Sequence, residues 1–289
     1  MTNANSTIVY LHLPKTGGSS IRLGIESCLD AHGGEVIHGH TLPPSQRSFH
    51  NKKGKDFERV KFAWAHWPFS YYRKYSGAEN DFVYMTCLRD PIQRVISFYQ
   101  EFKYREKPFA NPDHRAHFIY KYFNKYSLKD ALNFDLLASL PNPQGQQIFR
   151  LFDNTQTRVI ANTDGVFTGD PRMILGINVP KPMKDCFLYP SATNIATDYL
   201  LKYFSWIGIS EHINQEFNTM SKRFGLSCRR LKTDVQYHNV SPVKETDIDK
   251  ETIQKIKDWN SYDMSLFQWC IKHREHINTR PVRYVPKEF

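Results

Sequence analysis

The residues most suited to chemistry form a short glycine-containing turn near the start of the chain, in the segment LHLPKTGGSS. A run of β-branched and aromatic residues precedes this turn, and apolar residues at helical spacing follow it. A turn between a strand and a helix directs backbone N–H groups, and the positive end of the helix, toward an anion. We therefore expect an anion-binding loop made of Lys15, Thr16, Gly17, Gly18, Ser19 and Ser20.

This loop differs from the common ATP-binding loop. In the pattern G-x-x-x-x-G-K-[ST] the lysine follows the glycines, whereas Lys15 precedes Gly17 and Gly18. An ordinary ATPase or GTPase is disfavoured on this ground. The alternative interpretation is a tight surface turn with a solvated lysine.

A second candidate for anion binding is Arg89, which directly follows the nearly continuous apolar run DFVYMTCL. Such a run predicts a buried parallel strand, and open α/β sheets bind ligands at the carboxyl ends of their strands. The planar, permanently charged guanidinium of arginine suits a phosphate group. The alternative is an ion pair of Arg89 with Asp90 or with another carboxylate.

The helix predicted to follow this strand carries a possible partner for Arg89. Asp90 is a good N-cap and Pro91 suits the first helical position, so a helix is expected over residues 91–103. Ser97 lies three residues after Arg94, which places the two side chains on one helix face. The alternative for Ser97 is a hydroxyl on the helix surface.

The elements that must position these residues alternate along the chain. This alternation predicts an α/β fold with a parallel sheet covered by helices on both faces. Strands are expected over residues 7–13, 60–65, 81–88 and 204–209, and helices over residues 19–30, 91–103, 210–225 and 249–273. We expect one domain over residues 1–289, with a helical insertion at about residues 113–152.

The composition limits the partners and the location of the protein. The formal net charge is +10, which favours an anionic partner without choosing among nucleotides, nucleic acids, anionic glycans and membrane surfaces. The five cysteines are widely spaced and show no metal-binding or redox pattern, so we expect them to be reduced. No signal peptide or membrane-spanning run is apparent, and a cytoplasmic protein that does not insert into membranes is expected.

Taken together, LHLPKTGGSSI and LRDPIQRVISFY resemble the PAPS-dependent sulfotransferases, in particular the carbohydrate branch with the heparan sulfate 2-O- and 6-O-sulfotransferases. The resemblance implies a P-loop-like nucleotide-binding fold and 3′-phosphoadenosine 5′-phosphosulfate (PAPS) as donor co-substrate, without a metal. It implies that the loop binds the 5′-phosphosulfate and that Arg89 and Ser97 bind the 3′-phosphate. Later segments are also similar to that family, namely DNTQTRVI, WIGISEHI and YHNVSPV. The last resembles a loop closing over the nucleotide and suggests Asn239 and Ser241 as binding residues.

The resemblance also suggests the catalytic residues. In this family a histidine or glutamate between the two donor motifs takes the acceptor proton, and the loop lysine contacts the leaving oxygen. His66 in FAWAHWPF and Lys15 fill these roles here. His38 and His40 are the rival bases; their His-x-His spacing is also found in metal sites, but no carboxylate or cysteine cluster completes one.

The acceptor is expected to be a hydroxyl on a glycan or a small molecule. Aromatic residues near His66 suggest a wall for stacking on sugar rings, although half of them are expected in the core: Trp64, Trp67, Phe69, Tyr71 and Tyr72. Two other functions stay open. One is a small-molecule or nucleoside kinase with an atypical loop, and the other is a noncatalytic binder of anionic glycans. Nucleic acid is not expected as a partner, because no recognition signature for it is present.

Overall fold

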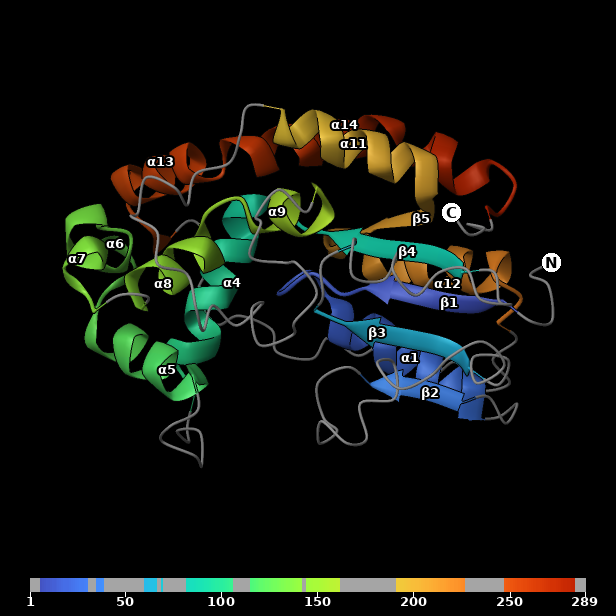
Figure 1. Cartoon of the computed structure of the whole chain (residues 1–289), viewed down its shortest axis with the longest axis horizontal. Helices are drawn as coiled ribbons and strands as arrows, with labels where there is room; N and C mark the ends of the chain where they lie inside the picture. Colours follow the sequence, from blue (N-terminus) through green and yellow to red (C-terminus); the bar gives the residue numbers. More distant parts are fainter. Residues whose placement is uncertain are drawn as a thin grey trace.

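The computed structural model describes residues 6–30, 35–38, 60–66, 69, 82–105, 115–141, 144–161, 191–226 and 247–283. Within this part of the chain, a five-stranded parallel sheet is packed between helices in one half of the molecule (Figure 1). The strand order is β2-β3-β1-β4-β5. The strands are β1 (Thr7–Leu11), β2 (Glu35–His38), β3 (Val60–Ala65), β4 (Phe82–Leu88) and β5 (Phe204–Ile209).

The central strand β1 is buried along its whole length. Its side chains alternate between the two faces of the sheet, as the pleat requires. Ile8 and Tyr10 belong to one hydrophobic cluster, whereas Val9 and Leu11 belong to another. Because both faces are covered, the strand needs apolar residues at consecutive positions, which explains the run TIVYL.

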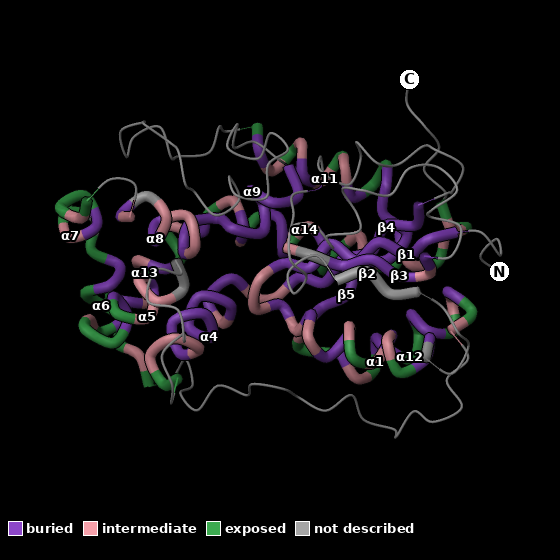
Figure 2. Tube along the Cα trace, turned by 60° about the horizontal axis from the view of Figure 1, so that its bottom comes forward, coloured by how far each residue is buried: buried purple, intermediate pink, exposed green. Residues whose placement is uncertain are grey.

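Helices cover the sheet on both sides and give three layers (Figure 2). One face packs against α1 (Gly18–Asp30) and α12 (Ile213–Arg223). The other packs against α9 (Thr155–Ala161), α11 (Ala192–Tyr203) and α14 (Ser261–Thr279). The predicted α/β class with a parallel sheet flanked by helices is therefore confirmed.

A second group of helices lies beside the sheet and has a hydrophobic cluster of its own (Figure 1). Its core includes Val95, Phe123, Phe149 and Ile256. The helices are α4 (Pro91–Lys103), α5 (Arg115–Lys125), α6 (Leu128–Ala131), α7 (Phe134–Ser139), α8 (Gln144–Phe152) and α13 (Lys250–Trp259). The insertion expected at residues 113–152 corresponds to α5 to α8, which pack against α4 and α13.

The ends of helices and strands agree with the prediction where the sequence has a clear helix cap or a continuous apolar run. Strands β3 and β5 and helix α4 have the predicted bounds, and Asp90 caps α4 by accepting from the N–H groups of Ile92 and Gln93. Strand β2 and helices α9 and α11 were not predicted. Strand β2 has only four residues, and α11 shows no side-chain cap. Helix α14 also continues to Thr279, beyond the predicted end at residue 273.

The cysteines correct one expectation. Cys28 is disulfide-bonded, to a partner outside the described residues, whereas Cys87 and Cys270 are free. The expectation that all five are reduced is therefore wrong for Cys28. Separately, none of the helices in the described part of the chain has the length and apolar character needed to cross a membrane.

Candidate functional site

The candidate residues lie at the carboxyl edge of the sheet because every strand pairing is parallel. The loop follows β1, His66 follows β3 and Arg89 follows β4. Strands β1 and β4 are neighbours, and the chain continues from β1 to β2 on one side of the sheet and from β4 to β5 on the other. This is the switch point where open α/β sheets bind ligands.

The backbone of the loop is held in an unusual conformation. Lys15 has φ +66° and Gly17 has φ +78°. A lysine in the left-handed region is strained, and such strain concentrates at functional sites. Buried Thr16 stabilises the turn, since its hydroxyl donates to the Leu13 carbonyl at 2.9 Å. The backbone N–H groups of Ser20 and Ile21 donate to the Gly17 carbonyl, which starts helix α1.

Gly17 is required by space as well as by conformation. A Cβ placed there would lie 2.7 Å from Ile213 Cδ1 and 2.9 Å from Ser210 Oγ. Gly225 has a similar φ of +66°, but a Cβ there meets nothing within 4 Å. Substitution of Gly225 therefore tests the effect of the positive φ alone, whereas substitution of Gly17 tests the positive φ together with steric crowding.

We expect Gly17→Ala to lose more stability than Gly225→Ala. Both variants lose about 1–2 kcal/mol because an L-residue is forced into the left-handed region. Only Gly17→Ala must also displace Ile213 and Ser210 from the loop. Denaturant unfolding of the two variants measures the difference, and equal losses would show that the loop tolerates a side chain at this position.

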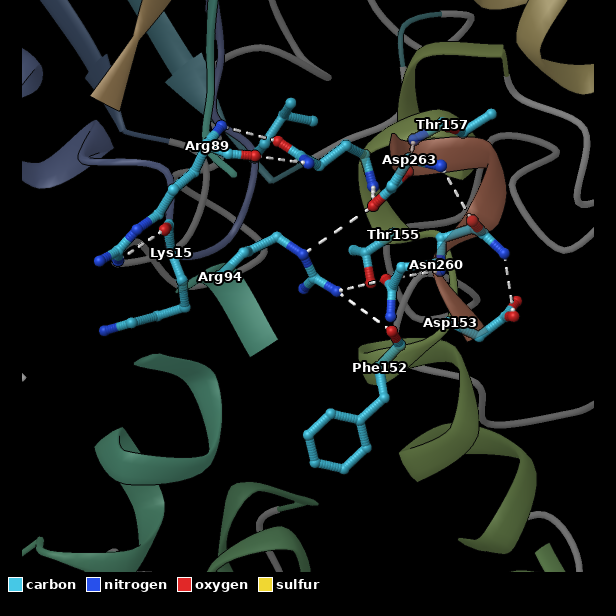
Figure 3. Close-up of polar contacts among 12 residues, drawn as sticks. Lys15, Arg89, Arg94, Phe152, Asp153, Thr155, Thr157, Asn260 and Asp263 are labelled. Carbon is cyan, nitrogen blue, oxygen red and sulfur yellow. Dashed lines mark hydrogen bonds and ion pairs between the residues drawn. The ribbon is translucent and has the colours of Figure 1, made fainter. Parts of the chain in front are cut away.

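Arg89 joins the two predicted anion-binding groups (Figure 3). Its Nη1 donates to the Lys15 carbonyl at 3.3 Å, and its Nε lies 3.7 Å from Glu211 Oε1. Burial lowers the pKa of Arg89, and the neighbouring Glu211 carboxylate opposes this shift. The alternative expectation of an ion pair is thus also met, with Glu211 as the partner.

The backbone of Arg89 is clamped by the side-chain amide of Gln156 in α9. The Arg89 N–H donates to Gln156 Oε1, and Gln156 Nε2 donates to the Arg89 carbonyl, both at 3.0 Å. Gln156 is completely buried. Glu211 accepts from the N–H of Asp90 at 3.2 Å, so two separate segments of the chain fix the backbone at the end of β4.

Ser97 and Arg94 lie on α4, as predicted, but the two side chains have different surroundings. Ser97 is buried, and its hydroxyl makes no hydrogen bond with any residue that the structure describes. Arg94 points away from Arg89 and toward Asn260 and Asp263 (Figure 3). The Arg94 guanidinium is 0% exposed, donates to the carbonyls of Leu151 and Phe152 and lies 4.0 Å from Asp263 Oδ2. It therefore belongs to the scaffold.

His66 is held by the backbone beside the loop. Its Nδ1 lies 2.6 Å from the His12 carbonyl oxygen. A carbonyl only accepts, so Nδ1 carries the proton and Nε2 of the neutral ring keeps its lone pair. Burial lowers the pKa of His66; the hydrogen bond to His12 opposes this, and the Lys15 charge adds to the lowering. The neutral ring is thus the stable form near pH 7.

Lys15 makes an ion pair that the sequence did not predict. Its Nζ lies 3.0 Å from Glu101 Oε2 on α4. Glu101 lies four residues after Ser97, so both side chains share one helix face. The lysine ammonium is therefore held next to the helix that carries Ser97.

Several residues of this edge escaped sequence analysis. His12 was read only as part of a strand, yet its ring centroid lies 4.1 Å from that of His66. A Cβ at Gly18 would lie 2.0 Å from the His12 ring, so the glycine allows this close approach. Gln156 and Glu211 lie in the segments DNTQTRVI and WIGISEHI, which were noted without singling out these residues. Nothing in local sequence marks Glu101.

Other predicted residues are not tested by the structure. His38 lies in β2, of which only the backbone is described, and His40, Asn239 and Ser241 lie outside the described residues. Of the aromatic wall, Trp64 and Phe69 are core residues, and the others are not described. No group of three or more His, Cys, Asp or Glu suited to a metal occurs within the described ranges.

A family model described as "Sulfotransferase family" matches residues 1–135. The matched segment includes the loop, His66, Arg89, Ser97 and Glu101. A search of curated proteins gave no significant match.

Proposed function

We propose that this chain, whose residues 1–135 match the sulfotransferase family model, transfers a sulfuryl group from PAPS to a hydroxyl of a carbohydrate. The family match supports sulfuryl transfer in general. The donor and the acceptor class are the finer part of this proposal, and they rest on the two anion-binding groups and on the resemblance of their motifs to the carbohydrate branch.

The contact between Arg89 and Lys15 carries the proposal. PAPS bears anionic groups at the 3′ and 5′ positions of one ribose, so its binding needs two cationic groups at one edge of a sheet. The 3.3 Å hydrogen bond from Arg89 Nη1 to the Lys15 carbonyl makes the two groups neighbours, although the residues are 74 positions apart. Arg89 Nη2 has no hydrogen-bond partner among the described residues, and together with the Ser97 hydroxyl it suits a 3′-phosphate.

The loop suits the 5′-phosphosulfate of the donor. The backbone N–H groups of Thr16, Gly17, Gly18 and Ser19 form no hydrogen bonds with described residues. They lie just before and at the start of helix α1 at Gly18, where the helix dipole also favours an anion. We assign the 5′-phosphosulfate to this loop.

The reaction needs a base and a cation, and the neighbouring side chains supply both. His66 Nε2 accepts the proton of the acceptor hydroxyl while the oxygen forms its bond to sulfur. The bond from sulfur to the phosphate oxygen breaks, and Lys15 stabilises the negative charge that grows there. The lowered pKa keeps His66 unprotonated and ready to act as the base. No metal is required in this scheme.

Adenosine 3′,5′-bisphosphate (PAP) should stabilise the protein against heat far more than 5′-AMP does. The difference comes from the 3′-phosphate, which only PAP offers to Arg89 and Ser97. At a concentration 100 times its Kd, a ligand adds about 2.7 kcal/mol to the free energy of unfolding. Thermal unfolding with PAP, 5′-AMP and ATP measures this, and equal shifts for all three would contradict a 3′-phosphate site.

The acceptor can be identified with sulfur-labelled PAPS and a panel of polysaccharides, oligosaccharides, lipids and phenols. A labelled carbohydrate product supports the proposal. Transfer to phenols alone would contradict the carbohydrate assignment, and transfer of phosphate from Mg·ATP would favour a kinase.

A further inference from the structure

The lysine of the proposed donor loop is paired with a carboxylate in the structure. Lys15 Nζ and Glu101 Oε2 lie 3.0 Å apart, and their side chains are only 18% and 30% exposed. The Lys15 backbone is fixed from the other side by Arg89, which donates to its carbonyl. A change of ion-pair partner at Lys15 therefore requires movement of its side chain and not of its backbone.

Glu101 is also provided with a second cation. Its Oε1 lies 3.4 Å from Arg105 Nη1, one turn further along the chain. If Lys15 leaves, the Glu101 carboxylate keeps this partner and is not left uncompensated. The pair of Lys15 and Glu101 can thus open without leaving an isolated charge.

The position of Glu101 brings it into conflict with the proposed donor. Glu101 and Ser97 lie one turn apart on the same face of α4, and Ser97 is assigned to the 3′-phosphate. A phosphosulfate bound to the Lys15 ammonium would lie next to the Glu101 carboxylate, and the two negative groups would repel each other. Binding of both anions to Lys15 at once is therefore less favourable than replacement of Glu101 by the phosphosulfate.

We propose that donor binding is an ion-pair exchange at Lys15, in which the anionic end of the nucleotide replaces Glu101. This inference rests on the proposed function and adds a regulatory role for a residue outside both motifs. Glu101 lowers the affinity for the nucleotide and holds the lysine away from the leaving-oxygen position until a donor has bound.

The test compares PAP binding to the wild type, Glu101→Gln and Glu251→Gln by calorimetry at one fixed salt concentration. Glu251 pairs with Lys129 at 2.6 Å and lies on helix α13, outside both anion-binding motifs, so its substitution removes the same charge elsewhere. A partly exposed ion pair corresponds to about a two- to fivefold change in affinity. We expect Glu101→Gln to bind PAP two- to fivefold more tightly and Glu251→Gln to bind it unchanged.

The other outcomes contradict the exchange. Unchanged or weaker binding by Glu101→Gln means that Glu101 does not compete, and equal tightening in both variants indicates a general charge effect. If the wild type fails to bind PAP, the proposed function itself fails, and the exchange fails with it.

A second measurement does not require the nucleotide. Acetic anhydride labelling, followed by peptide mass spectrometry, reports how readily the Lys15 amine reacts. The exchange predicts faster Lys15 labelling in Glu101→Gln than in the wild type. Equal labelling rates would show that the ion pair does not restrain Lys15, and would overturn the inference.

Discussion

Replacing His66 by alanine should lower kcat about 10²- to 10⁴-fold, the usual contribution of a general base, while leaving the Kd for PAP within about twofold. The reason is the separation of roles at the sheet edge. His66 Nδ1 donates to the His12 carbonyl, so Nε2 is the ring nitrogen that can accept a proton, and the proposed function gives it the proton of the acceptor. The assay is transfer from labelled PAPS under saturating donor, with PAP affinity measured in parallel.

His273→Ala is the matched control for this substitution. The His273 Nδ1 also contacts a backbone carbonyl, that of Trp269 at 2.8 Å, but His273 lies on α14 outside the site. We expect wild-type turnover from His273→Ala. Unimpaired turnover in His66→Ala would move the base to His38 or His40.

The pH dependence gives a further readout on the same residue. The base acts only when His66 is unprotonated, and burial lowers its pKa below the ordinary value of 6.5. Activity should therefore persist on the acidic side of pH 6.5 and fall only as the pH drops through this lowered pKa. An acidic limb centred above pH 6.5 would contradict His66 as the titrating group.

Removal of the Asp263 carboxylate should give the largest loss of stability. Its oxygens accept from the backbone N–H groups of Gln156 and Thr157 at 3.1 Å and 2.7 Å, at the start of α9. It also faces the guanidinium of Arg94, and both side chains are 0% exposed. Asp263→Ala leaves a buried cation without its nearest counter-ion, which costs about 3–5 kcal/mol. The free energy of unfolding in urea measures the loss.

Asp249→Ala is the control, because it removes a helix-capping carboxylate that is not buried. Asp249 caps α13 by accepting from the Thr252 N–H at 2.9 Å, but it is exposed. We expect a much smaller loss there, because water can replace the lost cap. Similar losses in the two variants would mean that the buried charge at Asp263 contributes little. If Asp263→Ala is too unstable to purify, Asp263→Asn keeps one acceptor oxygen and should show an intermediate loss.

The network around Asp263 also explains why the later segments matter to the site. Asn154 accepts from the N–H groups of Tyr262 and Asp263 at 2.9 Å, so α9 and α14 cap each other. This mutual capping fixes Gln156, and Gln156 in turn clamps the backbone of Arg89. A loss of Asp263 should therefore also weaken nucleotide binding in whatever protein remains folded.

Local sequence was sufficient for the elements with strong signals of their own. The cap at Asp90 and the proline at position 91 fixed the start of α4, and the apolar runs fixed β3 and β5. The loop and Arg89 were candidates because each follows a predicted strand, whereas the roles of His66 and Ser97 came from the resemblance of their segments to the sulfotransferases. Parallel pairing then brought them to one edge of the sheet.

Contacts between distant segments could not be predicted in the same way. Lys15 and Glu101 are 86 positions apart, Arg89 and Glu211 more than 100, and none of these acidic residues lies in a pattern that points to its partner. The four-residue strand β2 and the disulfide at Cys28 likewise depend on neighbours supplied by the fold.

By itself, the sequence determined the α/β class and the types of side chain available for binding anions, because caps, apolar runs and glycine turns act over a few residues. The tertiary structure alone decided which carboxylate faces each cation and which amide clamps Arg89. The physical reason is that ion pairs and hydrogen bonds depend on distances of a few ångströms, which only the packing of remote segments sets.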